Sequence, residues 1–377
     1  MPLLTGASPR RILMSVDAVG GVWTYALELV RGLSQSHMDV VLAVLGPAPS
    51  SEQLSEARQI PRLEMVQTGL PLDWTAHHEN DLDEVASRLK SLADRFEADL
   101  VHLNAPGHAG ASAWDRPLVV VAHSCVGTWW RAVREGPLPP DLAWRSERTR
   151  IGLGLADAVI APSRSFVRDL RAVYGSMPVS AVLNGSDAAP ARSLDTEKGV
   201  FLTAGRLWDP AKNVDAVNRA ADLAGIAVHA AGPLAGPNGE HATFQHLHLL
   251  GNLDKEELAR WYARTSVFIS MSKYEPFGLA VLEAARAGAA LILSDIPTFR
   301  ELWNGAALFV DANDPIALSE ALAYLKSHPI PREGLGRQAA ERAQQYTAQR
   351  MAKGTVAVYR RALRQRRAGR LRMRSVA

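Results

Sequence analysis

The sequence predicts an α/β protein built from two doubly wound parallel-sheet domains. Its 377 residues suit two domains of about 150 residues each. In both halves, short apolar runs rich in β-branched residues alternate with stretches whose apolar residues recur at helical spacing, a pattern typical of parallel sheets covered by helices. A polar, proline-containing stretch at 188–196 separates the halves. We therefore expect domains at 1–187 and 188–345, and a long helix with a basic tail at 346–377.

Composition excludes several classes of protein. The single cysteine, Cys125, rules out an internal disulfide and a cysteine-rich zinc site, so a reducing compartment is expected. No apolar run approaches the roughly 18 residues of a membrane-spanning helix. The apolar run Ile12–Val16 after Arg10-Arg11 is too short for a secretory signal and is interpreted as a first strand. A cytoplasmic location follows from these features.

The charge is distributed unevenly along the chain. Residues 360–377 carry eight arginines and no acidic residue, so the net charge of +3 leaves −5 on the remainder. A solvated tail is one explanation. The other is attachment to an anionic membrane surface, at about 1 kcal/mol per basic residue near the lipid. Nucleic acid is not an expected partner, because no reader motif or interleaved aromatic residues accompany the arginines.

The chain opens with a pattern common in phosphate-binding domains. The strand Ile12–Val16 is followed by a loop containing Gly20-Gly21 and by a helix with one apolar face. No G-x-G-x-x-G is present, so a dinucleotide fingerprint is not supported, and a tight turn is the alternative explanation for the glycines. Asp81-Leu82-Asp83 matches the D-x-D motif of metal-dependent sugar transferases. It lies where acidic residues favour a helix start, so we interpret it as structural.

Polar and aromatic residues follow the apolar strand 118–122. His123 comes at the carboxyl end of this strand, where open α/β sheets bind their ligands, although a structural histidine is the alternative. Trp129 and Trp130 follow, and Trp144 lies further on. Indole rings stack on sugars and lipids but are also frequent in protein cores. We favour a surface that binds a sugar or lipid acceptor.

The second half begins with strand 200–204 and the loop Gly205-Arg206 to Lys212-Asn213. An arginine fork and a lysine point charge within seven residues of a strand end would suit a pyrophosphate, with a basic surface loop as the alternative. His229, His241, His246 and His248 have no spacing that fits a closed metal site, so no metal is expected.

The segment Tyr274–Glu283 joins a buried strand at 266–270 to a helix at 279–286, which Gly288 ends. Pro276 is expected just inside the helix start. The N–H groups of Phe277, Gly278 and Leu279 would then face an anion at the positive end of the helix dipole. Glu275 would lie at the mouth of this site and Glu283 further along the helix. Solvated helix residues are the alternative for both glutamates.

The chain resembles a known family at these motifs. Glu275 and Glu283, separated by seven residues, resemble the E-x7-E motif of retaining glycosyltransferases of family 4, which have the GT-B fold. Gly205-Arg206-Leu207 with Lys212-Asn213, and Asn184-Gly185-Ser186-Asp187 at the domain boundary, are similar to further motifs of the family. The resemblance covers roughly residues 11–360. It implies two Rossmann-like domains facing across a cleft, with acceptor binding in the first, donor binding in the second, and a last helix that crosses back onto the first.

The resemblance also implies roles for the candidate residues. Arg206 and Lys212 would hold the diphosphate and stabilise the departing charge, Glu283 would bind the ribose, and His123 would orient the sugar or stabilise an oxocarbenium-like state. Glu275, with the backbone of Phe277 and Gly278, would hold the sugar hydroxyls. The remaining residues assigned to donor binding are Gly20, Gly21, Gly205, Asn213 and Leu279.

The predicted reaction is metal-independent transfer of a hexosyl group from a nucleoside diphosphate sugar to a hydroxyl of a saccharide or glycolipid, with retention of configuration and no cofactor. The leaving phosphate would take the acceptor proton in a same-face attack. A sugar-nucleotide epimerase or hydrolase of the same fold is one alternative. A non-catalytic sugar-nucleotide-binding subunit at a membrane is the other. The sequence does not specify the base, the sugar or the acceptor.

Overall fold

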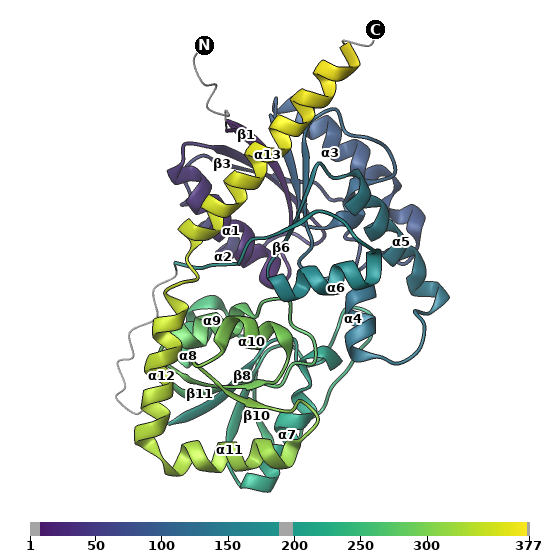
Figure 1. Ribbon diagram of the computed structural model, residues 1–377. Helices are drawn as coiled ribbons and strands as arrows, with labels where there is room; N and C mark the ends of the chain where they lie inside the picture. The colour runs from purple at the N-terminus through teal and green to yellow at the C-terminus, as the bar shows by residue number, and fades with distance from the viewer. Residues whose placement is uncertain (1–7, 188–198, 375–377) are drawn as a thin grey trace. The chain divides into compact units, whose positions relative to one another are not determined.

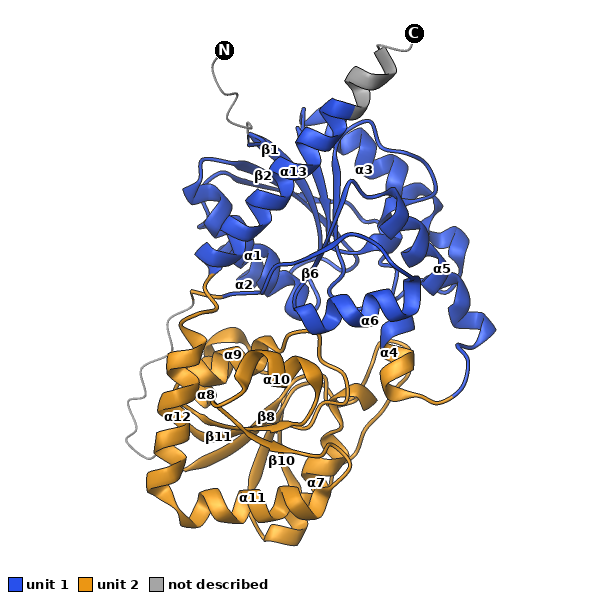
Figure 2. Cartoon of the chain, viewed as in Figure 1, with its two compact units in different colours: residues 1–128, 136–185, 348–377 blue, residues 129–135, 186–347 orange. Residues whose placement is uncertain are grey.

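A computed structural model describes residues 8–187 and 199–374, with side chains as far as residue 368. The chain forms two compact units (Figures 1 and 2). Unit 1 contains residues 1–128, 136–185 and 348–377, and unit 2 contains 129–135 and 186–347. The predicted linker at 188–196 lies outside the described residues. The predicted boundary beside it stays a prediction.

Unit 1 is organised around a seven-stranded parallel sheet in the order β3-β2-β1-β4-β5-β6-β7. Strand β1 pairs on both sides, with Ile12 opposite Val40 on β2 and opposite Leu100 on β4. The strands are β1 Arg11–Asp17, β2 Asp39–Leu45, β3 Leu63–Gln67, β4 Leu100–Leu103, β5 Leu118–Val121, β6 Ala158–Ala161 and β7 Val179–Ala181. β1 and β4, where the strand order reverses direction, are neighbours.

Helices cover this sheet. They are α1 Gly21–Gln35, α2 Ser51–Arg58, α3 Asp83–Arg95, α5 Pro140–Leu155, α6 Arg164–Tyr174 and α13 Ala348–Arg374, with short 3₁₀ turns at Glu79–Leu82 and Pro106–Ala109. A further helix, α4 Val126–Val133, begins in unit 1. The final helix, α13, packs against α1 as predicted for a helix that returns to the first domain (Figure 1). Gly32 permits this close approach, because a Cβ there would lie 2.5 Å from the Cβ of Ala352. Residues Trp129–Val133 of α4 are counted with unit 2.

Unit 2 has a six-stranded parallel sheet in the order β10-β9-β8-β11-β12-β13. Its strands are β8 Val200–Ala204, β9 Val228–Ala231, β10 Leu247–Gly251, β11 Thr265–Ser270, β12 Ala290–Ser294 and β13 Leu308–Val310. Its helices are α7 Val214–Ala224, α8 Lys255–Arg264, α9 Leu279–Arg286, α10 Pro297–Trp303, α11 Pro315–Ser327 and α12 Pro329–Ala343, with a 3₁₀ turn at Pro210–Lys212. Buried apolar clusters on the two faces of the sheet form its core.

The predicted strands at 118–122, 200–204 and 266–270 and the predicted helix at 279–286 are observed as β5, β8, β11 and α9, each within one residue of the expected bounds. Two parallel, helix-covered sheets therefore confirm the predicted fold class.

The predicted position of Pro276 is wrong. α9 begins only at Leu279, and Gly278 precedes it with a left-handed backbone (φ 92°), so Pro276 belongs to the loop. Among the described helices, none is long and apolar enough to cross a membrane.

Candidate functional site

The predicted charged residues of unit 2 gather where the strand order of its sheet reverses. β8 and β11 are hydrogen-bonded neighbours. The strands that follow β8 add to the sheet on one side of this pair, and the strands that follow β11 add on the other side. Their carboxyl ends lie at one edge because the strands are parallel, and such a reversal point is where open α/β sheets bind ligands. The loop after β8 carries Arg206 and Lys212, and the loop after β11 carries Glu275.

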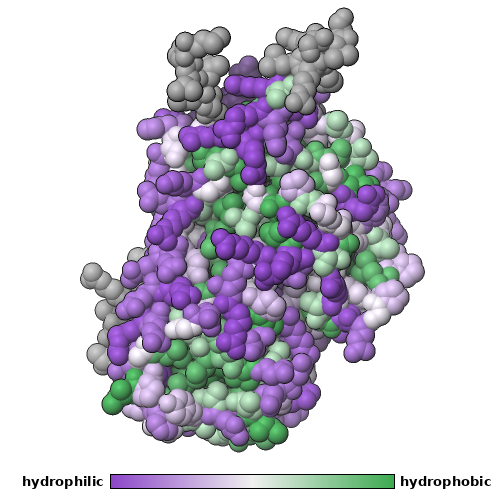
Figure 3. Space-filling view, in the orientation of Figure 1, coloured by the Kyte–Doolittle hydropathy of each residue, from purple (hydrophilic) through white to green (hydrophobic). Residues whose placement is uncertain are grey.

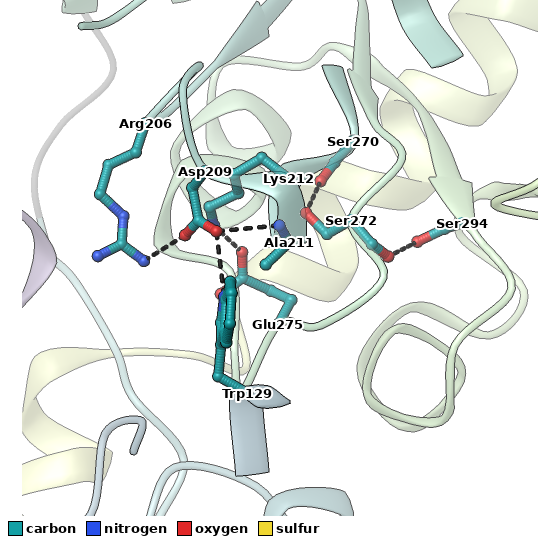
Figure 4. A network of polar contacts seen from close by, with 9 residues as sticks. All are labelled: Trp129, Arg206, Asp209, Ala211, Lys212, Ser270, Ser272, Glu275 and Ser294. Atoms are coloured by element: carbon teal, nitrogen blue, oxygen red, sulfur yellow. Dashed lines mark hydrogen bonds and ion pairs between the residues drawn. The ribbon is translucent and has the colours of Figure 1, made fainter. Parts of the chain in front are cut away.

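Asp209 organises the first of these loops (Figure 4). Its side chain is only 4% exposed, and one oxygen accepts a hydrogen bond from the Arg206 guanidinium at 2.8 Å. The other oxygen accepts from the backbone N–H of Ala211 at 2.9 Å and from the indole N–H of Trp129 at 3.1 Å. A buried carboxylate needs several such donors to offset its lost hydration. Asp209 therefore fixes Arg206, whose side chain is still 51% exposed and able to meet a ligand.

Lys212 forms the second charged pair. Its ammonium group donates a hydrogen bond to the Glu275 carboxylate, and the two side chains are 23% and 14% exposed. The pair joins the loop after β8 to the loop after β11 (Figure 4). Each cation that was assigned to a diphosphate thus has its own carboxylate partner. Such an arrangement keeps the partly buried cations in place and leaves them able to share their donors with an incoming anion.

The start of α9 differs from the predicted geometry. Gly278 takes the left-handed conformation that favours glycine, and its carbonyl accepts from Leu282 N–H. Leu279 is the first helical residue, so the N–H groups of the first turn begin there. Phe277 is buried and packs edge-to-face on Tyr346, with ring centroids 5.8 Å apart. Its side chain anchors the loop in the core, which leaves only its backbone for a ligand.

Glu283 lies in the second turn of α9 and is half-buried. The Tyr262 side chain on α8 is buried, and burial raises the pKa of its hydroxyl well above the ordinary value, with the Glu283 carboxylate adding to the effect. Glu283 is therefore not a fully solvated helix residue. The ribose role assigned to it stays a prediction.

Two other predicted donor residues have visible backbone or structural tasks. Gly205 has φ 150°, and the neighbouring loop approaches it so closely that a Cβ on Gly232 would lie 1.8 Å from the Gly205 carbonyl oxygen. Asn213 uses its amide to donate to the carbonyls of Met271 at 3.1 Å and Ala312 at 2.7 Å. The Asn213 side chain thus ties three loops of the same sheet edge together, and its contact with a donor remains a prediction.

In unit 1, His123 belongs to a neutral hydrogen-bond network. Its Nε2 lies 2.9 Å from Asn104 Oδ1, and Nε2 of His102 lies 3.2 Å from the same oxygen. His102 Nδ1 lies 2.7 Å from the hydroxyl of Tyr359 on α13. The Tyr25 ring packs edge-on against His123 at 4.3 Å. Gly20, with φ 76°, and Gly21 form the turn into α1.

Burial keeps both histidines of this network uncharged. It lowers the pKa of His102 to about 4, and it lowers the pKa of His123 to about 3, with His102 adding to the effect on His123. An imidazolium would lose its hydration there without gaining a carboxylate. His123 is therefore a neutral imidazole at physiological pH.

Sequence reasoning missed several residues of these two networks, among them Asp209, Asn104, His102 and Tyr359. The Asp-Pro pair at 209–210 was an available signal, because Asp is a common helix N-cap and Pro a common first residue. Tyr359 and His102 are 257 positions apart, and no local pattern connects them.

No group of three or more His, Cys, Asp or Glu residues that could hold a metal ion occurs in the described part of the chain. His229 and His248, weighed as ligands above, stack on one another with centroids 5.1 Å apart. Asp81 accepts hydrogen bonds from the backbone N–H groups of His77 and His78, as a structural role at a helix start requires.

Comparison with known families covers both halves of the chain. The family model for Glycosyltransferase Family 4 matches residues 19–189, and the family model for Glycosyl transferases group 1 matches residues 188–342. The chain belongs to glycosyltransferase family 4 and has the GT-B fold. The predicted resemblance and fold are thereby confirmed.

Relatives of this glycosyltransferase match it over most of their length. A D-inositol 3-phosphate glycosyltransferase of Streptomyces bingchenggensis is 27% identical, covering 98% of this chain and 92% of the relative. A glycogen synthase of Mycobacterium tuberculosis is 26% identical, covering 90% and 91%. Among solved structures, sucrose-phosphate synthase of Thermosynechococcus elongatus has TM-score 0.75 at 19% identity, covering 93% and 98%. The Anabaena protein Alr3699/HepE in complex with UDP-glucose has TM-score 0.67 at 17% identity, covering 92% and 98%.

Proposed function

We propose that this glycosyltransferase moves a hexosyl group from a nucleoside diphosphate sugar to a hydroxyl of a saccharide or glycolipid, with retention of configuration and without a metal ion. The observation that carries the proposal is the pair of cations at the reversal point of the unit 2 sheet, Arg206 held by Asp209 and Lys212 held by Glu275. Two positioned cations suit a pyrophosphate, the group that departs in this reaction.

We propose one role for each of these side chains. Arg206 and Lys212 bind the diphosphate and stabilise the charge that develops as it leaves. In the bound state Glu275, released in part from Lys212, accepts hydrogen bonds from sugar hydroxyls, and the backbone around Gly278 adds N–H donors. Glu283 binds the ribose. Because the cations and the start of α9 supply the positive charge, a metal ion is dispensable.

A hydroxyl acceptor is supported by relatives that are named glycogen synthase and D-inositol 3-phosphate glycosyltransferase. The structural neighbour Alr3699/HepE binds UDP-glucose, which supports a nucleotide-sugar donor. We propose polysaccharide or glycolipid assembly as the setting, with no covalent enzyme intermediate. The departing phosphate takes the proton of the acceptor hydroxyl on the same face of the sugar.

A membrane surface is proposed as a further partner through α13. Its exposed arginines include Arg360, Arg361, Arg364 and Arg367, whereas Arg366 pairs with Asp157. Hydrophilic residues dominate the surface seen around this helix (Figure 3). The arginines at 370, 372 and 374 have no described side chains. Co-sedimentation with anionic but not with zwitterionic vesicles is expected, and replacing Arg364 and Arg367 by glutamine should weaken it.

The decisive experiment is a thermal-shift panel with UDP, GDP, ADP and their common sugar conjugates, with and without EDTA. A stabilising nucleotide whose effect survives EDTA is the expected result and identifies the base. Incubation of that sugar nucleotide with and without candidate acceptors then distinguishes transfer from hydrolysis or epimerisation. If no nucleotide stabilises the protein with or without saccharide and lipid acceptors, the proposed donor site is wrong.

A further inference from the structure

The buried amide of Asn104 determines the direction of every hydrogen bond in the network around His123. Its Nδ2 lies 2.7 Å from the backbone carbonyl oxygen of Ser15, which can only accept, so the NH2 group faces Ser15. The Oδ1 atom consequently faces the two histidines. The backbone N–H of Asn104 donates to the Ser15 hydroxyl at 3.1 Å, which fixes the residue further. Asn104 is 6% exposed and Ser15 is 1% exposed.

An oxygen that only accepts requires a proton on each nitrogen that contacts it. His123 and His102 must therefore both carry their proton on Nε2. His102 Nδ1 then has a lone pair, and the hydroxyl of Tyr359 must donate to it. The Tyr359 side chain is fully buried, and burial raises its pKa well above the ordinary value, so the hydroxyl keeps its proton.

These hydrogen bonds determine which ring nitrogen of His123 carries the proton. With its proton on Nε2 and directed at Asn104, the ring presents Nδ1 as a hydrogen-bond acceptor. The edge-on Tyr25 ring restricts rotation of the imidazole. Burial also lowers the pKa of the His123 ring, so the ligand-free protein presents a neutral imidazole without a proton on Nδ1.

We infer that Asn104, His102 and Tyr359 are positioning residues which hold His123 as the Nε2-protonated imidazole, with Nδ1 as the acceptor for a hydroxyl of the transferred sugar. This inference rests on the proposed function for its substrate. It favours orientation of the sugar over stabilisation of the transition state by an imidazolium as the role of His123. It also gives α13 a task in catalysis, because Tyr359 supplies the first donor of the network.

The test combines nitrogen NMR with kinetics on the full chain. Ring ¹⁵N signals of labelled histidine report which nitrogen carries the proton, and a His123→Gln variant assigns the relevant signals among the eleven histidines. In the wild type, His102 and His123 should each show a single Nε2-protonated form. In Asn104→Ala, the tautomers of His123 should mix. The value of kcat/KM should fall about 10- to 100-fold, as for a misplaced substrate-orienting group.

Tyr359→Phe is the second variant, in case Asn104→Ala does not fold. It removes the donor to His102 Nδ1, while Asn104 Oδ1 still accepts from His102 Nε2. His102 should therefore stay protonated on Nε2, the ¹⁵N signal of its Nδ1 should shift as that nitrogen loses its hydrogen bond, and kcat/KM should fall about threefold or more. Tyr346→Phe is the matched control, because it also loses a buried tyrosine hydroxyl, which donates to the Leu302 carbonyl at 2.6 Å in unit 2. Thermal unfolding checks that the tyrosine variants lose similar stability. The control should leave the His102 and His123 signals unchanged.

A wild-type His123 protonated on Nδ1 would overturn the inference. So would an Asn104→Ala enzyme whose His123 tautomer is unchanged or whose kcat/KM stays within twofold of the wild type. The proposed function fails differently: if the wild type transfers no sugar, the NMR signals still report the hydrogen-bond directions, and only the substrate of Nδ1 is lost.

Discussion

At the carboxyl edge of the unit 1 sheet, the polar network around His123 is neutral, whereas at the same edge of the unit 2 sheet the network around Arg206 and Lys212 is charged. His123, His102 and Asn104 form bonds whose directions are fixed by one amide. Arg206 and Lys212 are instead neutralised by Asp209 and Glu275. A neutral network holds a single geometry because each donor has one acceptor. A charged pair can redistribute its hydrogen bonds when another anion arrives, which suits a site that binds and releases a diphosphate.

Of the effects predicted here, the largest is the loss of stability in acid that the neutral histidines of unit 1 should cause. Lowering the pH should reduce the free energy of unfolding by several kcal/mol. Unfolded histidine has a pKa near 6.5, but in the fold burial lowers the pKa of His102 to about 4 and that of His123 to about 3. Their stabilising contribution is complete above pH 6.5 and is lost as the pH falls towards the folded values. Each histidine should cost about 1.4 kcal/mol per pH unit in that window.

Urea denaturation between pH 7.5 and 4.5 measures this dependence. The buried His108, whose pKa burial also lowers, contributes in the same direction. A His102→Leu variant is the control, because removal of one of these groups should make the slope shallower. Equal slopes for the variant and the wild type would contradict the neutral-histidine description of unit 1.

Removing a cation from the charged network of unit 2 should lower the turnover number. Arg206→Ala removes the exposed cation at the reversal point and should lower kcat about 100-fold or more, near 3 kcal/mol, because a positioned donor to a developing charge is lost. Arg219→Ala is a matched control, since Arg219 pairs with Asp215 on the surface of α7. Turnover of Arg206→Ala within threefold of the wild type would refute the assigned role.

The contact between α13 and α1 connects the neutral network to the end of the chain. Gly32→Ala places a Cβ 2.5 Å from the Cβ of Ala352 and should destabilise the protein by about 1–3 kcal/mol. Gly154→Ala is the control, because that helical glycine has no atom within 4 Å of an added Cβ and should gain a few tenths of a kcal/mol or more. Both values come from chemical denaturation. Equal values for the two variants would mean that α13 shifts without cost.

The smallest expected effect tests how Asp209 holds Arg206. Asp209→Asn keeps an acceptor for Ala211 and Trp129 but loses the ion pair, so kcat should fall about tenfold while stability changes little. Asp215→Asn, which breaks only an exposed helical pair, should leave kcat unchanged. A fall of similar size in both variants would indicate a general charge effect instead of orientation.

The predictions from sequence were best where local pattern and local chemistry coincide. Strand β8 and helix α9 were predicted at their observed bounds, because continuously apolar and amphipathic runs are local properties. Arg206, Lys212 and Glu275 were predicted from short motifs, and the structure brings these three together. Pro276 was wrongly expected inside the start of α9, because Pro at a helix start is only a tendency. The left-handed Gly278 precedes a helix that begins at Leu279, three residues after Pro276.

The sequence by itself determined two parallel-sheet halves and the residues that resemble family 4 motifs, since these depend on periodicity and on contiguous stretches of chain. The return of the last helix onto the first domain was expected from the resemblance alone. Only the tertiary structure decided which carboxylate neutralises which cation. It also decided that Asn104 and Tyr359 control the proton on His123. These contacts join residues from separate strands and from opposite ends of the chain, where side-chain burial and hydrogen-bond direction follow from packing and not from local sequence.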